Sequence, residues 1–258
     1  MTLTFPRLLR SEWLKLKTLR STWVTIGAAM VVLVLASFLI ANNMHNHLGD
    51  ARGFDPEDRD VLTTPLRGFG PTQLIVGVLG VLAITGEYAT GMIRASLAAV
   101  PKRLPVLWAK LLVFAGFAFV AMTIASFAAF FTSQQVLGSY GVDLSAPHAV
   151  RVLFALAGYL TLVGLFGLGL GFIVRSTSGA IASLVGLLLV APGILAAIGT
   201  TWSSDVQHYL PLSAGVAMFS DRPPTGGDLT PGGGLVTMLL WVAASLIGAA
   251  IMLTKRDA

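Results

Sequence analysis

Cysteine is absent from the 258-residue sequence, and only 11% of its residues are charged. Without cysteine the chain can form neither a disulfide framework nor a thiolate metal site. Hydrophobic residues, in contrast, make up 55% of the sequence, more than the core of a soluble domain of this length requires. The excess indicates a surface that faces lipid. The composition therefore predicts an integral membrane protein.

Two further absences narrow the function. No Gly-Lys pair occurs, so the chain lacks a P-loop of the usual form, whose lysine reaches the terminal phosphates of ATP. No ionisable residue lies in the middle of any of the six apolar stretches that are long enough to span a membrane, which weighs against ion-coupled transport. His45 and His47 form a His-x-His, but no third metal ligand at suitable spacing is evident, and we interpret them as loop residues.

The net charge of +5 raises the question of a nucleic-acid partner. A nucleic-acid surface gathers basic and aromatic residues on a solvated face. Here the basic residues lie beside apolar stretches instead. We therefore expect no nucleic acid among the partners.

Six apolar stretches each approach the length of about 20 helical residues that crosses about 30 Å of hydrocarbon. We expect an all-α membrane helix bundle of six transmembrane helices in a single domain, residues 1–258. The spans are expected at about residues 23–41, 68–86, 111–137, 152–174, 176–201 and 235–254. Arg175 and the polar run after it separate the fourth span from the fifth and predict a tight helical hairpin.

Basic residues are distributed unevenly between alternate connections. The N-terminal segment, the connections between spans two and three and between spans four and five, and the C-terminal tail together carry twelve basic and three acidic residues. The other three connections carry five basic and nine acidic residues. Because basic residues are retained in the cytoplasm, both termini are predicted to be cytoplasmic in a multi-pass protein of the cell membrane.

Residues 1–20 predict an amphipathic helix before the first span. One arc of this helix is apolar and holds Phe5, Leu8, Leu9, Trp13, Leu16 and Leu19. Such a helix lies in the membrane interface, with its basic residues toward lipid phosphates, and enters the first span by an elbow. Glu12 falls inside the apolar arc, so it either extends to the interface or pairs with Arg20 or a cation of another segment. The simpler alternative is that these basic residues only anchor the topology.

The connection between spans two and three is the most distinctive segment. Glu87 and Arg94 bracket a stretch of helical character, and Pro101 and Pro105 are expected to end it and turn the chain back toward the membrane. The alternative is an ordinary basic cytoplasmic turn.

In this segment the sequence resembles the type 2 ABC exporter permeases, whose loop shows a Glu, then Gly, a basic residue, a Leu-rich turn, and Pro, Arg and Lys. The residues that fit this pattern are Glu87, Gly91, Arg94, Leu97, Pro101, Arg103 and Lys110. The N-terminal residues Glu12, Trp13, Lys15, Leu16 and Arg20 resemble the elbow helix of that family. The six-span layout is similar to one permease half.

The resemblance implies that residues 87–105 form a coupling segment that docks on a separate ATP-binding subunit. The residues it assigns to this contact are Glu87, Tyr88, Gly91, Arg94, Pro101 and Arg103. ATP and Mg²⁺ would bind to that partner, so this chain would be no enzyme and would hold no cofactor or metal. A second permease chain, identical or different, would complete the substrate path. The alternative functions are a secondary transporter and a noncatalytic membrane scaffold or sensor.

Two features concern the last third of the chain. The connection at residues 202–234 contains an apolar stretch, 209–219, too short to span, which predicts a re-entrant or interfacial helix or a loop packed on the external face. Pro192 lies inside the fifth span and predicts a kink that lines the path. Glycines at positions 164, 167 and 171 and at 179, 186 and 193 predict close helix contacts, within the chain or between two copies.

Overall fold

The computed structural model describes residues 4–48, 60–92, 104–224 and 226–255, which form helices and no strand. Within these residues, six helical segments are long and apolar enough to cross a membrane. Their bounds are Arg20–His47, Pro65–Ala89, Leu104–Tyr140, Ala149–Val174, Thr177–Ile198 and Pro231–Lys255. The expectation of an all-α bundle with six membrane-crossing helices is confirmed, and the protein is a multi-pass membrane protein.

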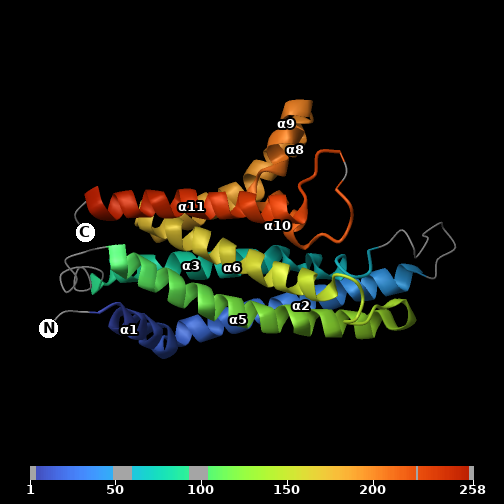
Figure 1. Ribbon diagram of the computed structural model, residues 1–258, viewed down its shortest axis with the longest axis horizontal. Helices are drawn as coiled ribbons and strands as arrows, with labels where there is room; N and C mark the ends of the chain where they lie inside the picture. The colour runs from blue at the N-terminus through green and yellow to red at the C-terminus, as the bar shows by residue number, and fades with distance from the viewer. Residues whose placement is uncertain (1–3, 49–59, 93–103, 225, 256–258) are drawn as a thin grey trace.

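The long helices run lengthwise along one bundle, with α2 and α5 in one direction and α3, α6 and α11 in the other (Figure 1). They are α2 (Arg20–Leu48), α3 (Phe69–Ala89), α5 (Leu104–Leu137), α6 (Ala149–Val174) and α11 (Pro231–Lys255). Helix α1 (Phe5–Thr18) begins, and α11 ends, at the same end of the bundle. We call this the N-terminal end; it also holds the end of α3, the start of α5 and the end of α6.

Helix α6 lies in the middle of the bundle and packs against α3, α5 and α11. Glycines bring α6 and α3 into close contact. A Cβ atom on Gly80 would overlap the carbonyl oxygen of Gly164, and one on Gly167 would overlap that of Gly77. The glycines of α6 therefore serve packing within the chain, because small residues let helix backbones approach closely.

The chain reverses between α6 and α7 (Thr177–Val185) at Arg175. Arg175 has a left-handed backbone, with φ of 57°, and the hydroxyl of Ser176 accepts a hydrogen bond from the amide of Gly179 at the start of α7. The Arg175 guanidinium also donates to the carbonyl of Met252, at 2.9 Å, and so fastens the hairpin to α11.

The fifth span is irregular in its second half. A π-helical turn, η4 (Gly186–Val190), follows α7, and α8 (Ala191–Ile198) then leads away from the bundle into α9 (Thr201–His208), as Figure 1 shows. Pro192 lies in the first turn of α8 and lacks the N–H that would bond the carbonyl of Leu188. The π-helical turn includes Leu188, the residue whose carbonyl Pro192 cannot bond.

Helix α10 (Pro211–Phe219) follows α9 and packs against α11 and α6. Arg151 of α6 donates to the carbonyls of Met218, at 3.2 Å, and Ser220, at 2.8 Å. The last carbonyls of α10 are thereby satisfied by a side chain. The apolar stretch within residues 202–234 is thus a short helix joined to the bundle.

Several expected boundaries were wrong. Helix α1 ends before Leu19, which is extended, so Arg20 begins α2 instead of closing the elbow helix. Helix α3 continues to Ala89 and places Glu87 in its last turn rather than in a loop. Helix α5 begins at Leu104, so Pro105 starts a helix instead of turning the chain, since the first turn needs no N–H from proline.

The two histidines of the His-x-His were also misplaced. Helix α2 continues to Leu48, so His45 and His47 lie in its last turns and not in a loop. The Nδ1 atom of His47 is 2.7 Å from the carbonyl oxygen of Asn43, one turn earlier. Among the described residues, no group of three or more His, Cys, Asp or Glu side chains is placed to hold a metal ion.

Candidate functional site

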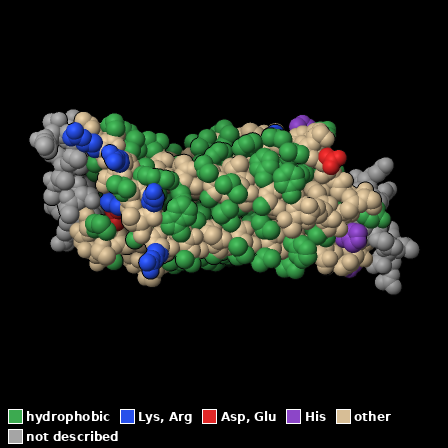
Figure 2. All heavy atoms as spheres, turned by 90° about the horizontal axis from the view of Figure 1, so that it is seen from below, with side chains coloured by type: hydrophobic (Ala, Val, Ile, Leu, Met, Phe, Trp, Pro, Cys, Tyr) green, Lys and Arg blue, Asp and Glu red, His purple; other side chains and the backbone are tan. Residues whose placement is uncertain are grey.

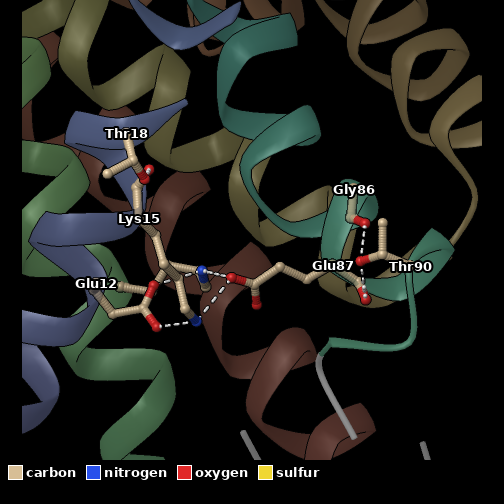
Figure 3. Close-up of polar contacts among 7 residues, drawn as sticks. Glu12, Lys15, Thr18, Gly86, Glu87 and Thr90 are labelled. Atoms are coloured by element: carbon tan, nitrogen blue, oxygen red, sulfur yellow. Dashed lines mark hydrogen bonds and ion pairs between the residues drawn. The ribbon is translucent and has the colours of Figure 1, made fainter. Parts of the chain in front are cut away.

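Four charged side chains meet at the N-terminal end of the bundle, where α1 approaches the end of α3 and the start of α5 (Figure 3). The Nζ atom of Lys15 lies 2.6 Å from Glu12 Oε1 and 3.0 Å from Glu87 Oε1. The Nζ atom of Lys110 lies 2.7 Å from Glu12 Oε2 and 2.8 Å from Glu87 Oε1. Acidic and basic groups alternate around a closed cycle, which we call the ion-pair ring.

The ring joins segments that are far apart in the chain. Glu12 and Lys15 lie one turn apart on α1, Glu87 lies in the last turn of α3, and Lys110 lies in the second turn of α5. The Lys110–Glu12 bond spans 98 positions of sequence and the Lys15–Glu87 bond spans 72. The segment from Glu87 to Lys110 therefore starts and ends on the same cluster.

The ring is largely withdrawn from solvent. Glu12, Glu87 and Lys110 are 6%, 7% and 5% exposed. The side chain of Lys15 is more open, at 23%. Charges in such surroundings interact more strongly than at a surface, but they also lose hydration, so the geometry is favourable only while every charge keeps its partners.

The two ring residues of α1 are both shifted toward their charged forms. Burial alone would raise the pKa of Glu12, but Lys110 and Lys15 outweigh it and hold the pKa below the ordinary value of 4.5. Burial alone would lower the pKa of Lys15, but Glu12 and Glu87 outweigh it and hold the pKa above 10.5. At neutral pH both groups are therefore charged.

One carboxylate oxygen of the ring accepts no hydrogen bond from the described residues. Glu87 Oε2 is buried and has no hydrogen-bond partner among the described residues. A cavity of about 460 Å³ borders the ring and is lined by all four of its residues together with apolar side chains of α3 and α5. The ring therefore adjoins open space within the protein.

The remaining coupling residues expected from the resemblance divide into two groups. The Tyr88 ring lies nearly perpendicular to the ring of Phe172, and the Arg175 guanidinium lies 5.3 Å from the Tyr88 ring centroid. Gly91 has φ of 72°, a conformation that favours glycine, and it follows the end of α3. Arg94, Leu97, Pro101 and Arg103 lie outside the described residues.

The elbow residues are separated by the structure. Glu12 and Lys15 belong to the ring, whereas Trp13 points its ring edge at Phe117 of α5, with centroids 6.4 Å apart. Arg20 forms no ion pair within the described part of the chain, so the partners of Glu12 are Lys15 and Lys110 and not Arg20. Pro192, the expected path kink, is distant in sequence from the ring and lies on α8.

Lys110 was the ring residue that sequence reasoning did not select as a site. It fits the family pattern, but it was not assigned to the elbow or to the coupling contact. Its signal is a lysine inside an otherwise apolar run, 106–118, in a helix that the structure extends back to Leu104. A lysine in such a run needs an acidic partner.

What this arrangement can do is mechanical. It offers no described metal-binding group and no nucleophile paired with a base, but it fastens α1 to the two helices that flank residues 90–103. A force applied to that segment would reach α1, α3 and α5 together, since the ring and the helices are rigid connections.

Comparison with known proteins gives one informative result. A model of the family described as ABC-2 family transporter protein matches residues 8–193, which is more than half of the chain and includes the whole ion-pair ring. Comparison with curated proteins finds no match.

Proposed function

Since this chain belongs to the ABC-2 family of membrane transporter proteins, we propose that it is the permease subunit of an ATP-driven exporter, coupled to a separate ATP-binding subunit at the N-terminal end of the bundle. A second permease chain, identical or different, completes the substrate path. Both termini are cytoplasmic in the cell membrane, and α1 lies in the inner membrane interface. ATP and Mg²⁺ bind to the partner subunit.

The ion-pair ring is the observation that supports this coupling role. Glu87 and Lys110 flank the segment expected to contact the partner, and they bond to each other at 2.8 Å. Each also bonds to α1, Lys110 to Glu12 and Glu87 to Lys15. Movement of the ATP-binding subunit is transmitted through this segment to α3 and α5, and through the ring to α1. Without the ring, α1 would keep its apolar packing on α5 but would lose its charged link to Glu87 of α3.

Tyr88 extends the connection to a second pair of helices. Its ring packs beside Phe172 of α6 and beneath Arg175, which in turn donates to Met252 of α11. The end of α3 therefore contacts α6 and the hairpin between spans four and five, and Arg175 links it to the last span. A displacement at residues 90–103 would reach α6 through Tyr88 and α11 through Arg175.

The absence of cysteine allows a direct test of partner contact. Met92, just after α3, is 43% exposed and would carry a single photo-crosslinker as Met92→Cys. Exposed Ser145, in the connection between α5 and α6 at the opposite end of the bundle, gives the matched control Ser145→Cys. We expect a protein with a P-loop to be captured from native membranes by Met92→Cys and not by Ser145→Cys. Capture by neither variant, or equal capture by both, would contradict the proposal.

The same two variants test orientation. With both termini cytoplasmic, a membrane-impermeant maleimide added to intact cells labels Ser145→Cys and leaves Met92→Cys unlabelled until the membrane is opened. The reversed pattern would overturn the orientation without affecting family membership.

A measurement of ATP hydrolysis tests whether the ATPase activity belongs to the partner subunit and not to this chain. The purified chain alone is expected to hydrolyse no ATP, whereas the complex captured through residue 92 hydrolyses it. Hydrolysis by the chain alone, or ATP-independent transport by it, would contradict a permease role.

A further inference from the structure

A long apolar groove lies between α1, α2 and α5, outside the ion-pair ring. It has a volume of about 1090 Å³ and is lined by residues such as Leu9, Trp13, Trp23, Met30 and Ile124. Among the described residues that line it, Arg10 alone is charged. We propose that this groove binds one acyl chain of an anionic phospholipid, whose phosphate is held by Arg10 and Arg7.

The length of the groove fits an acyl chain. Its lining on α5 extends from Leu112 to Ile124, which at about 1.5 Å per residue is about 18 Å. The hydrocarbon of one leaflet is about 15 Å thick, half of the whole. The groove therefore accommodates a chain over roughly the depth of one leaflet.

The headgroup end of the groove is basic. Arg10 also borders a neighbouring hollow of about 420 Å³ that Arg7, Ser11, Lys15 and Thr18 line. Arg7 and Arg10 form no ion pair within the described part of the chain. Glu12, the one acidic residue of α1, is already bonded to Lys15 and Lys110 and is buried. Arg10 at the groove and Arg7 in the adjoining hollow, with no ion pair among the described residues, complement a lipid phosphate.

Figure 2 shows this face of the molecule from below. Lys and Arg side chains gather toward one end of the face, and its middle is hydrophobic and uncharged. Trp13 and Trp23 line the groove and both pack edge-on against Phe117, at 6.4 and 5.3 Å between centroids. Tryptophans are typical of the level where headgroups meet hydrocarbon.

Two glycines leave space that the protein does not fill. Gly27 of α2 and Gly116 of α5 line the groove, and a Cβ atom added at either would meet nothing within 4 Å. A larger side chain at Gly116 would therefore extend into the groove from a Cβ position that meets no neighbour. Gly193 of α8 has the same open surroundings but lies outside the groove, and so gives a matched control.

Tryptophan fluorescence reads the occupancy directly. Replacing Trp108, Trp202 and Trp241 by phenylalanine leaves Trp13 and Trp23 as the only reporters. The full chain is reconstituted in phosphatidylcholine vesicles that contain a small fraction of either brominated phosphatidylglycerol or brominated phosphatidylcholine, because bromine quenches a tryptophan it contacts. We expect the brominated phosphatidylglycerol to act as if enriched roughly fivefold, the effect of one basic residue near an anionic surface.

Variants separate the headgroup contact from the acyl-chain contact. Arg10→Gln is expected to remove most of the preference for phosphatidylglycerol. Gly116→Leu is expected to reduce quenching by both lipids, and Gly193→Leu to change neither. Equal quenching by the two lipids in the unmodified groove, or a preference that persists when Arg7 and Arg10 are both glutamine, would overturn the proposal.

A second copy of the chain is the competing occupant, and the same experiment detects it. A copy seated in the groove would protect both tryptophans from either brominated lipid, and that protection would also overturn the proposal. A disulfide-linked dimer of Gly116→Cys would in addition show that the two copies meet near this residue. The measurement requires no ATP-binding subunit, so its outcome does not depend on the coupling role.

Discussion

The two ends of the bundle hold their charged residues in different ways. At the N-terminal end, three of the four ring residues are almost fully buried and the ring distances lie between 2.6 and 3.0 Å. At the opposite end, Asp221 faces His148 at 3.0 Å and Arg151 at 3.4 Å, and these side chains are 27%, 62% and 37% exposed.

This difference separates a structural connection from a surface contact. A buried pair costs hydration on both sides, so removing one partner leaves an uncompensated charge and is strongly destabilising. An exposed pair is screened by water and contributes little. The N-terminal end is therefore the place where three helices are held to one another by charge, whereas the opposite end is held mainly by apolar packing and by the bonds of Arg151 to backbone carbonyls.

The largest effect is expected from Lys110→Met. This change leaves Glu12 and Glu87 sharing the ammonium group of Lys15, and we expect the free energy of unfolding to fall by about 3–5 kcal/mol. Equilibrium unfolding in mixed detergent micelles measures it. Lys17→Met, an exposed lysine of the same charge on α1, is the control and should change stability by less than about 0.5 kcal/mol. A Lys110→Met protein as stable as the parent would contradict the structural role of the ring.

A smaller loss is expected from Lys15→Met. Lys15 bonds to both glutamates, but its side chain is 23% exposed and water compensates part of the loss. We expect a decrease of about 1–2 kcal/mol, below the value for a fully buried charged bond. Measured in the same micelles, a loss as large as that of Lys110→Met would show that the ring depends equally on its open and its buried cation.

Acid and alkali act on the same cluster through titration. The pKa of Glu12 is lowered in the folded protein. Its contribution to the free energy of unfolding is therefore fully present above pH 4.5, and it is lost as the pH falls through the lower pKa of the folded state. The pKa of Lys15 is raised in the folded protein. Its contribution to the free energy of unfolding is therefore fully present below pH 10.5, and it is lost as the pH rises through the higher pKa of the folded state. Ring stability should thus be level between these limits. The unfolding midpoint against pH measures this, and Glu12→Gln should flatten the acid limb; an unchanged acid limb would exclude Glu12 as its source.

How far sequence could predict this molecule depends on the range of the interactions concerned. The spans and the reversal at Arg175 follow from local patterns, since an apolar run of sufficient length and a charged interruption need no knowledge of distant residues. Helix ends were less predictable. Pro105 was expected to turn the chain and instead begins α5, because proline in the first turn is compatible with either outcome.

For the ion-pair ring, the sequence predicted that Glu12 needs a cation but not which cation it binds. An acidic residue at position 12 on an apolar arc requires a cation, and the sequence offered either Arg20 or one from another segment. The choice of Lys110, 98 positions away, is made by the packing of α1 on α5, which no local pattern specifies. The π-helical turn before Pro192 was unpredictable in the same way. Proline predicts an irregularity in the helix, but whether a π-helical turn forms before it depends on the neighbouring helices.

The smallest effect is expected from Asp221→Asn at the opposite end. His148 and Arg151 both lose their acidic partner, but Arg151 keeps its bonds to the carbonyls of Met218 and Ser220. His148 is exposed, and Asp221 and Arg151 are partly exposed, so water compensates much of the loss. We expect a change of at most about 1 kcal/mol in the same unfolding measurement, and less at high salt. A loss comparable to that of Lys110→Met would mean that burial does not separate the two ends, and that the charges around α10 hold the bundle together as firmly as the ring does.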